Sequence, residues 1–302
     1  MTGADMAALL AGWAPEATEV TETIAAGPAL ALAGMFDCKP PVTGPGDPIP
    51  PLWQWLYFLD RPAQRELGPD GHPAASQFMP PIPGRRRMYA GGRVSYQAPI
   101  RSGDRVTRRS ELANWTVRTG RTGELLFVSV RHIFSRGREI LATEEQDLVY
   151  RSGPATGPAA RTATTQPAAA QSATGQPERA QTAAPAAPWH LRLMADPVLL
   201  FRFSALTYNS HRIHYDTGYA TAVEGHPGLV VHGPLLALLC AELPRRHLPA
   251  RRLSRFSFRA RSPLYCGEEL AVSGGLRGDG CTLRVSAPDG TEALTAEGNF
   301  AA

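Results

Sequence analysis

The segment from Phe201 to Leu239 is dense in side chains that can do chemistry. Within it, Asn209 and His214 stand five positions apart, with His211 and Arg212 between them. A tight turn leading into a short helix can direct an amide and an imidazole at this spacing toward one point. Because imidazole titrates close to neutral pH, we expect His214 to act as a base. An amide exchanges no proton at neutral pH, so Asn209 can hold a water molecule or orient His214.

The same segment contains Val231-His232-Gly233-Pro234 ahead of an apolar run. Proline is favoured in the first turn of a helix, so we expect a helix to begin here. The backbone amide of Gly233 then lies at the positive end of that helix and can donate to a developing oxyanion. We therefore predict an oxyanion-binding role for Gly233.

Four further residues are candidate substrate contacts. Arg212 and Arg202 can each bind a free carboxylate, because a planar guanidinium matches a carboxylate through two hydrogen bonds. For Arg202, an exposed charge on a strand is an equally good interpretation. Tyr208 and His232 complete the predicted substrate-binding set, and a purely structural role is an equal alternative for each.

The composition limits the function classes. With 43% hydrophobic and 19% charged residues, the chain has the composition of a soluble globular protein. No apolar run approaches the ~20 residues that cross a bilayer, and the first residues lack the pattern of a secretory signal. We expect a cytoplasmic protein without a membrane partner.

Basic charge does not point to nucleic acid here. The net charge is +4, but Lys39 is the only lysine, which indicates a general preference for arginine rather than a basic face built for binding. No zinc-finger or RRM signature accompanies the arginines. Four cysteines lack CxxC spacing and lie at no metal-ligand interval from a histidine. We expect neither nucleic acid nor a metal.

The chain divides into two halves. From residue 152 to 188 there is no aliphatic residue larger than alanine and no aromatic residue, so this segment cannot bury enough apolar surface to become ordered. We predict a disordered linker over 152–188, with domains over 1–151 and 189–302. At 302 residues, two domains of ordinary size are expected.

Both halves carry the same pattern of elements. Val94–Val106 and Phe256–Leu270 each alternate apolar and polar residues and place a glycine four residues after a proline, which predicts strand, turn and strand. An apolar helix candidate precedes each, over Leu52–Leu59 and Leu235–Leu243. A curved antiparallel sheet around a buried helix is a hotdog, so we predict an α+β double hotdog.

These residues also resemble a known family. Tyr208-Asn209-Ser210-His211-Arg212-Ile213-His214 resembles the Gly-Asp-x-Asn-Pro-x-His motif of MaoC-type enoyl-CoA hydratases. Longer segments are similar to mesaconyl-C4-CoA hydratases and related 3-hydroxyacyl-thioester dehydratases: PPLWQWLYFL, RRRMYAGGRV, GRTGELLFVSVRH, EEQDLVYR, RFSALTYNSHRIHYD and YATAVEGHPGLVVHGPL. The likeness covers both halves and omits only the linker.

The resemblance implies a hydro-lyase that adds water to an α,β-unsaturated acyl-CoA. It places catalysis in the second half and lets the degenerate first half help form the acyl tunnel. His214 and Gly233 match the family's catalytic imidazole and oxyanion-binding positions. Asn209 departs from the pattern, because the family carries Asp there. Either His214 performs both proton steps through water, or Asp216 or His211 contributes.

Within this class, the resemblance favours a substrate like mesaconyl-C4-CoA. The alternatives are a dehydratase of fatty or polyketide 3-hydroxyacyl chains on CoA or acyl carrier protein, and a non-catalytic hotdog that binds acyl thioesters. A hotdog thioesterase is a further option. We expect no cofactor apart from the CoA thioester substrate, and a homodimer.

Overall fold

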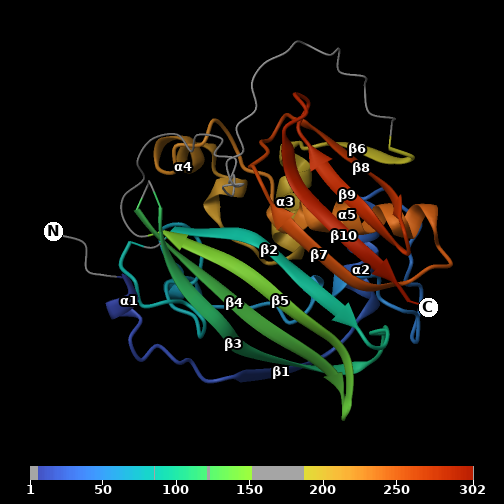
Figure 1. Cartoon of the computed structure of the whole chain (residues 1–302), viewed down its shortest axis with the longest axis horizontal. Coiled ribbons are helices and arrows are strands. Elements are labelled where there is room, and N and C mark those ends of the chain that lie inside the picture. The colour runs from blue at the N-terminus through green and yellow to red at the C-terminus, as the bar shows by residue number, and fades with distance from the viewer. Residues whose placement is uncertain (1–5, 85, 121–122, 152–186, 302) are drawn as a thin grey trace, which may run out of the picture.

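Ten strands form one antiparallel sheet in the computed structural model, which describes residues 6–84, 86–120, 123–151 and 187–301. The strand order is β1-β3-β4-β5-β2-β7-β10-β9-β8-β6. In Figure 1 the strands of the two halves lie side by side and meet at β2 and β7. The strands are β1 (Thr18–Thr23), β2 (Arg86–Tyr96), β3 (Arg105–Gly120), β4 (Gly123–Arg136), β5 (Glu139–Arg151), β6 (Trp189–Met194), β7 (Leu253–Ala260), β8 (Glu269–Arg277), β9 (Gly280–Ser286) and β10 (Glu292–Phe300).

The two halves share one series of main elements. Each has a six-residue strand, a ten-residue helix, a central helical segment and four longer strands, and the strand order of one half mirrors that of the other. This arrangement confirms the predicted α+β double hotdog. The predicted linker over 152–188 lies outside the described residues except for its last two. The helical segments are α1 (Met6–Leu9), α2 (Ala26–Met35), η1 (Trp53–Leu56), η2 (Gln64–Glu66), α3 (Pro197–Leu206), η3 (Arg212–His214), α4 (Thr217–Ala222) and α5 (Gly233–His247).

The central helix of the second half begins where the sequence predicts. Helix α5 starts at Gly233, with Pro234 in its first turn, and every residue from Leu235 to Pro244 is buried. It lies against β7, β8, β9 and β10. A helix buried on all sides explains why its sequence is apolar nearly all round.

The corresponding segment of the first half is much shorter than predicted. Instead of a helix over residues 52–59, the structure has the four-residue 3-10 helix η1. Leu52 and Phe58 adopt left-handed backbone conformations with φ of 68° and 57°, which end regular helix on both sides. The apolar run is buried as predicted, but large rings rather than helical turns fill the space, as Trp53 at 0% exposure illustrates.

One backbone feature shapes the junction between the halves. β2 has an irregular register between Tyr89 and Gly91, and the next residues pair with both β5 and β7. Gly91 has a φ of +154°, and a Cβ atom there would lie 2.4 Å from the carbonyl oxygen of Phe258. Glycine is the residue that tolerates both the conformation and the close approach.

The described part of the chain contains no helix with the length and apolar character that crossing a membrane requires.

We expect Gly91→Ala to weaken the junction between the two halves. The added methyl group meets a backbone oxygen and strains the backbone, so the free energy of unfolding should fall by roughly 3 kcal/mol. Gly137→Ala is the matched control, because Gly137 also has a positive φ (+59°) but has no atom within 4 Å of its Cβ position. Urea denaturation of both variants measures the difference. Equal losses would show that the contact with Phe258 contributes nothing.

Candidate active site

His214 is a buried imidazole with a fixed proton. It ends η3, and 8% of its surface remains exposed. Its Nδ1 lies 2.7 Å from the carbonyl oxygen of Val230, which can only accept a hydrogen bond. Nδ1 therefore carries the proton of the neutral ring, and Nε2 keeps a lone pair. Burial lowers the pKa of His214 to about 4, so the ring is a neutral base at pH 7.

The ring of His232 packs against the ring of His214. The two rings stack with centroids 3.6 Å apart and planes 20° apart. The Nε2 of His232 shares a 2.9 Å hydrogen bond with the Ser204 hydroxyl. His232 has 0% exposure, so it offers no surface to a substrate. The geometry therefore differs from the substrate contact predicted for His232 and gives it a role in orienting His214.

Gly233 is brought next to the imidazole pair. His232 is the N-cap of α5, and Gly233 is the first residue of that helix. Amide groups in the first turn have no acceptor within the helix, and they lie at its positive end. The structure thus brings together three of the predicted site residues, since His214 stacks on His232 and His232 directly precedes Gly233.

Asn209 builds the turn that presents His214. Tyr208, two residues after the end of α3, takes a left-handed conformation with a φ of 51°. The Asn209 amide donates to the Ser204 carbonyl at 2.8 Å, and the Oδ1 of Asn209 accepts from the His211 amide at 3.0 Å. The side-chain oxygen is thus used within the turn, which leaves the Nδ2 group as the part of Asn209 that can bind a water molecule.

A loop of the first half closes over this turn. The carbonyl of Asp70 accepts from the Arg212 amide at 2.8 Å, and the carbonyl of Gly71 accepts from the Ser210 hydroxyl at 2.5 Å. Gly71 has a φ of +87°, and a Cβ atom there would lie 1.9 Å from the carbonyl oxygen of Ser210. The Pro69-Asp70-Gly71 sequence is a typical turn signal, but nothing in it indicates which segment the turn contacts.

The loop also brings a histidine and a carboxylate to the site. The ring of His72 lies 4.1 Å from that of His211, whose centroid is 5.4 Å from that of His214. Asp70 lies 3.1 Å from the Nδ1 of His72. Burial raises the pKa of Asp70, but the hydrogen bonds and charge of His72 outweigh this effect and lower it to about 2. Sequence reasoning missed both residues.

Asp70, His72 and His211 are also the described residues whose ligand atoms are grouped tightly enough to hold a metal ion, all within 4.8 Å of one another. The carboxylate of Asp70 already accepts from the amide and the ring of His72.

Arg212 is held by the protein itself. Its Nε and one terminal nitrogen lie 3.0 and 2.8 Å from Asp216, and the other donates to the carbonyl of Pro69 at 2.9 Å. The guanidinium also lies over the ring of Tyr219, 4.2 Å from its centroid. These bonds use three of the five N–H groups of Arg212 and hold its guanidinium between Asp216 and Pro69. Asp216 is engaged as well, because it caps α4 through the amide of Tyr219.

Tyr208 and Arg202 were also predicted as substrate contacts. Tyr208 is 58% exposed beside the turn. Arg202 lies on α3 rather than on a strand, and its guanidinium is 3.8 Å from the Cβ position of Gly34 in α2. By contrast, Tyr89 of the first half lies 3.2 Å from the Cβ position of Gly233, and the sequence did not single it out.

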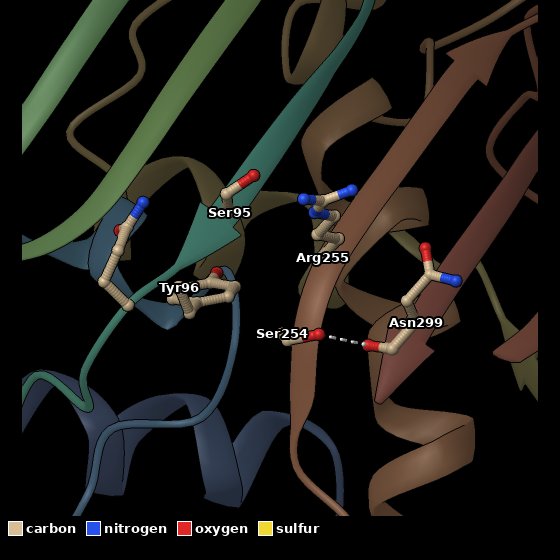
Figure 2. Close-up of a pocket in the computed structure, with 6 residues that line it drawn as sticks. Ser95, Tyr96, Ser254, Arg255 and Asn299 are labelled. Atoms are coloured by element: carbon tan, nitrogen blue, oxygen red, sulfur yellow. Dashed lines mark hydrogen bonds between the residues drawn. The ribbon is translucent and has the colours of Figure 1, made fainter. Parts of the chain in front are cut away.

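A polar surface pocket of about 460 Å³ lies at the β2–β7 junction, away from these residues. Figure 2 shows β2 on one side of it and β7 and β10 on the other, and the Ser254 hydroxyl donates to the Asn299 carbonyl at 3.3 Å. It shares no lining residue with the histidine cluster, and it is not part of the candidate site. The pocket is lined by Ser95, Tyr96, Gln97, Ser254, Arg255 and Asn299.

Comparisons with known proteins show which family the sequence matches. A model of the family described as hydroxyacyl-thioester dehydratase type 2 matches residues 52–266. The chain is similar to the mesaconyl-C(4)-CoA hydratase of Chloroflexus aurantiacus, with 41% identity over 286 residues that cover 94% of this chain and 95% of that protein.

Solved structures share the architecture. A MaoC-like dehydratase from Phytophthora capsici superimposes with a TM-score of 0.67 at 14% identity and covers 99% of both chains. A conserved hypothetical protein from Mycobacterium tuberculosis with a double hotdog fold superimposes with a TM-score of 0.58 at 14% identity, over 95% of this chain and 96% of that one. Likeness at this level of identity shows the fold.

We expect the buried histidines to make the protein acid-sensitive. The folded-state pKa of His214 is about 4, below the ~6.5 of an unfolded chain, so only the unfolded chain takes up this proton between those values. Stability is therefore full above pH 6.5 and is lost as the pH falls toward 4, by up to about 1.4 kcal/mol per pH unit for each such group.

His214→Gln should reduce the slope of the unfolding free energy against pH by the contribution of one histidine, up to about 1.4 kcal/mol per pH unit. Denaturation curves recorded from pH 7 to 4.5 measure this slope. His190→Gln at an exposed position is the matched control. An unchanged slope in His214→Gln would contradict the assigned neutral state.

Proposed function

The chain belongs to the family of type 2 hydroxyacyl-thioester dehydratases, and from this premise we propose that it interconverts a short 2-enoyl-CoA and its 3-hydroxy form. It is a hydro-lyase. Within that class, the proposed substrate is an acyl-CoA like mesaconyl-C4-CoA, the substrate named for the relative that is 41% identical over 94% of the chain. The observation that carries the proposal is a neutral imidazole, His214, next to the free amide end of α5.

Hydration begins with the lone pair on the Nε2 of His214. The ring takes a proton from water, and the hydroxide formed adds to the β-carbon of the thioester. Negative charge then develops on the thioester oxygen, where the Gly233 amide and the positive end of α5 stabilise it. Protonation of the α-carbon completes the addition, and dehydration follows the same steps in reverse.

A single imidazole accounts for both proton transfers. Asn209 has no proton to exchange, and Asp216 is paired with Arg212. Burial, together with the neighbouring His72 and His214, lowers the pKa of His211 to about 2, so His211 holds no acidic proton at neutral pH. His214 is protonated by the attacking water, and in this proposal it delivers that proton to the α-carbon. Asn209 positions the water through its Nδ2 group.

The proposal extends to the setting of the enzyme. It acts on CoA thioesters rather than on acyl carrier protein, in the cytoplasm, and as a homodimer. The CoA thioester named for the relative that is 41% identical supports the first statement, and the open edges that β1 and β6 leave on the sheet support pairing of two copies. Dehydration of fatty or polyketide 3-hydroxyacyl chains is the competing activity.

We expect His214→Ala to lower kcat for hydration of mesaconyl-C4-CoA by roughly 10³-fold, because it removes the group that moves both protons. Loss of the absorbance of the conjugated thioester measures the rate, and the exposed His190→Ala should keep wild-type activity. Binding without turnover by the wild-type protein would instead identify an acyl-thioester binder. Release of free thiol would identify a thioesterase.

Arg212→Leu separates two roles for this arginine. A carboxylate clamp requires a loss on mesaconyl-C4-CoA and an unchanged rate on crotonyl-CoA, which has no free carboxylate. The bonds of Arg212 to Asp216 and Pro69 favour a structural role, so we expect kcat/KM to fall by a similar factor, about tenfold or more, on both substrates. Steady-state rates on the two thioesters decide between these roles.

A further inference from the structure

The first half differs from the second in what fills its sheet. Where the second half has the 15-residue α5, the first has only the four-residue η1. Beside η1, three rings meet across the junction of the halves: Trp55 from η1, Tyr89 from β2 and Phe258 from β7. Their centroids lie 5.8 to 6.5 Å apart. We call these three residues the aromatic wall.

The aromatic wall stands directly beside the tip of α5. A Cβ atom on Gly233 would lie 3.2 Å from the Cδ1 atom of Tyr89 and within 4 Å of two more of its atoms. A thioester whose oxygen is bound by the Gly233 amide would therefore lie near the Tyr89 ring. The absence of a side chain on Gly233 makes this close approach possible.

The hydroxyl group of Tyr89 has no use inside the protein. Its oxygen is buried, and no hydrogen-bond partner for it exists among the described residues. Buried polar atoms without partners are rare in native proteins, and each one calls for an explanation. Burial, with the nearby Glu144 and Asp147, raises the pKa of Tyr89, so the group is a hydroxyl that can donate.

The two acidic neighbours of this hydroxyl are already occupied. Glu144 is buried and accepts from the Nε1 of Trp55 at 2.7 Å, and also from Gln146 at 2.7 Å and Gln54 at 3.1 Å. Asp147 accepts from Arg93 at 3.2 Å and from Ser129. The hydrogen bond from Trp55 to Glu144 holds the indole in place, so the aromatic wall is fixed in position.

We propose that the aromatic wall is the end of the acyl pocket, and that the Tyr89 hydroxyl donates a hydrogen bond to an oxygen carried by the acyl group. The wall limits the enzyme to short acyl groups, and the hydroxyl selects those that carry a carboxylate over plain hydrocarbon chains. This inference rests on the proposed function and narrows it to short dicarboxylic acyl-CoA thioesters.

Tyr89→Phe tests the hydroxyl, because it removes one oxygen and leaves the ring in place. We expect KM for mesaconyl-C4-CoA to rise roughly ten- to a hundredfold, as for loss of a hydrogen bond to a charged group, with crotonyl-CoA changed by no more than about twofold. Tyr57→Phe is the matched control, since its hydroxyl bonds to the carbonyl of Ala25 within the first half. A Tyr89→Phe enzyme with an unaltered ratio of the two substrates would overturn the selective role.

Trp55→Ala and Phe258→Leu test the limit on length. Wild type should hydrate trans-2-octenoyl-CoA at least a hundredfold more slowly than crotonyl-CoA, and either variant should narrow this gap at least tenfold. The second substitution is the milder one and serves if the first prevents folding. Wild-type enzyme that hydrates both chains equally would overturn the wall. Wild-type enzyme that hydrates none of these thioesters would instead refute the proposed function, so the two failures differ.

Discussion

The hydrogen bond from the Nδ1 of His214 to the carbonyl of Val230 determines what the site can do. It fixes which nitrogen carries the proton, and burial keeps the ring uncharged. The acceptor is itself held, because the Val230 amide donates to Ile213 and the next amide, of Val231, donates to Leu264. The residues from Val230 to His232 therefore orient the imidazole of His214 and lead directly into the start of α5.

The two halves contribute different parts of the candidate site. The second half keeps a full central helix and places His214 and Gly233, whereas the first half has reduced its helix to η1 and contributes a loop and a ring. Direct bonds tie these parts together, including that from the Nε1 of Trp53 to the buried Glu242 of α5 at 3.2 Å. The site is complete only because β2 and β7 join both halves into one sheet.

A structural feature could be predicted from the sequence where it depends on residues that are close together in the chain. Strand alternation and the start of α5 depend on neighbouring residues, so the sequence could predict both. The contact of Ser210 with Gly71 joins positions 139 residues apart, and no local pattern reveals it. The helix expected over 52–59 was wrong because an apolar run reports burial alone. The geometry of Leu52 and Phe58 decides the conformation.

Arg212 illustrates the same limit from the opposite side. Its residue type predicted binding of a substrate carboxylate, and the carboxylate that it contacts within the protein is that of Asp216, four positions later. Sequence reasoning identified the chemistry and could not identify the partner, since an internal acid and a substrate acid offer the same group to a guanidinium.

The placement of Tyr89 on a different half from His214 has a consequence for evolution. Mutations in β2 can alter which acyl groups fit while the imidazole, its carbonyl partner and the tip of α5 stay untouched. Substitutions in the first half can therefore change the substrate specificity of such an enzyme, while the second half keeps the groups that carry out the reaction. With two copies of the hotdog in one chain, one copy can accept substitutions that alter substrate specificity.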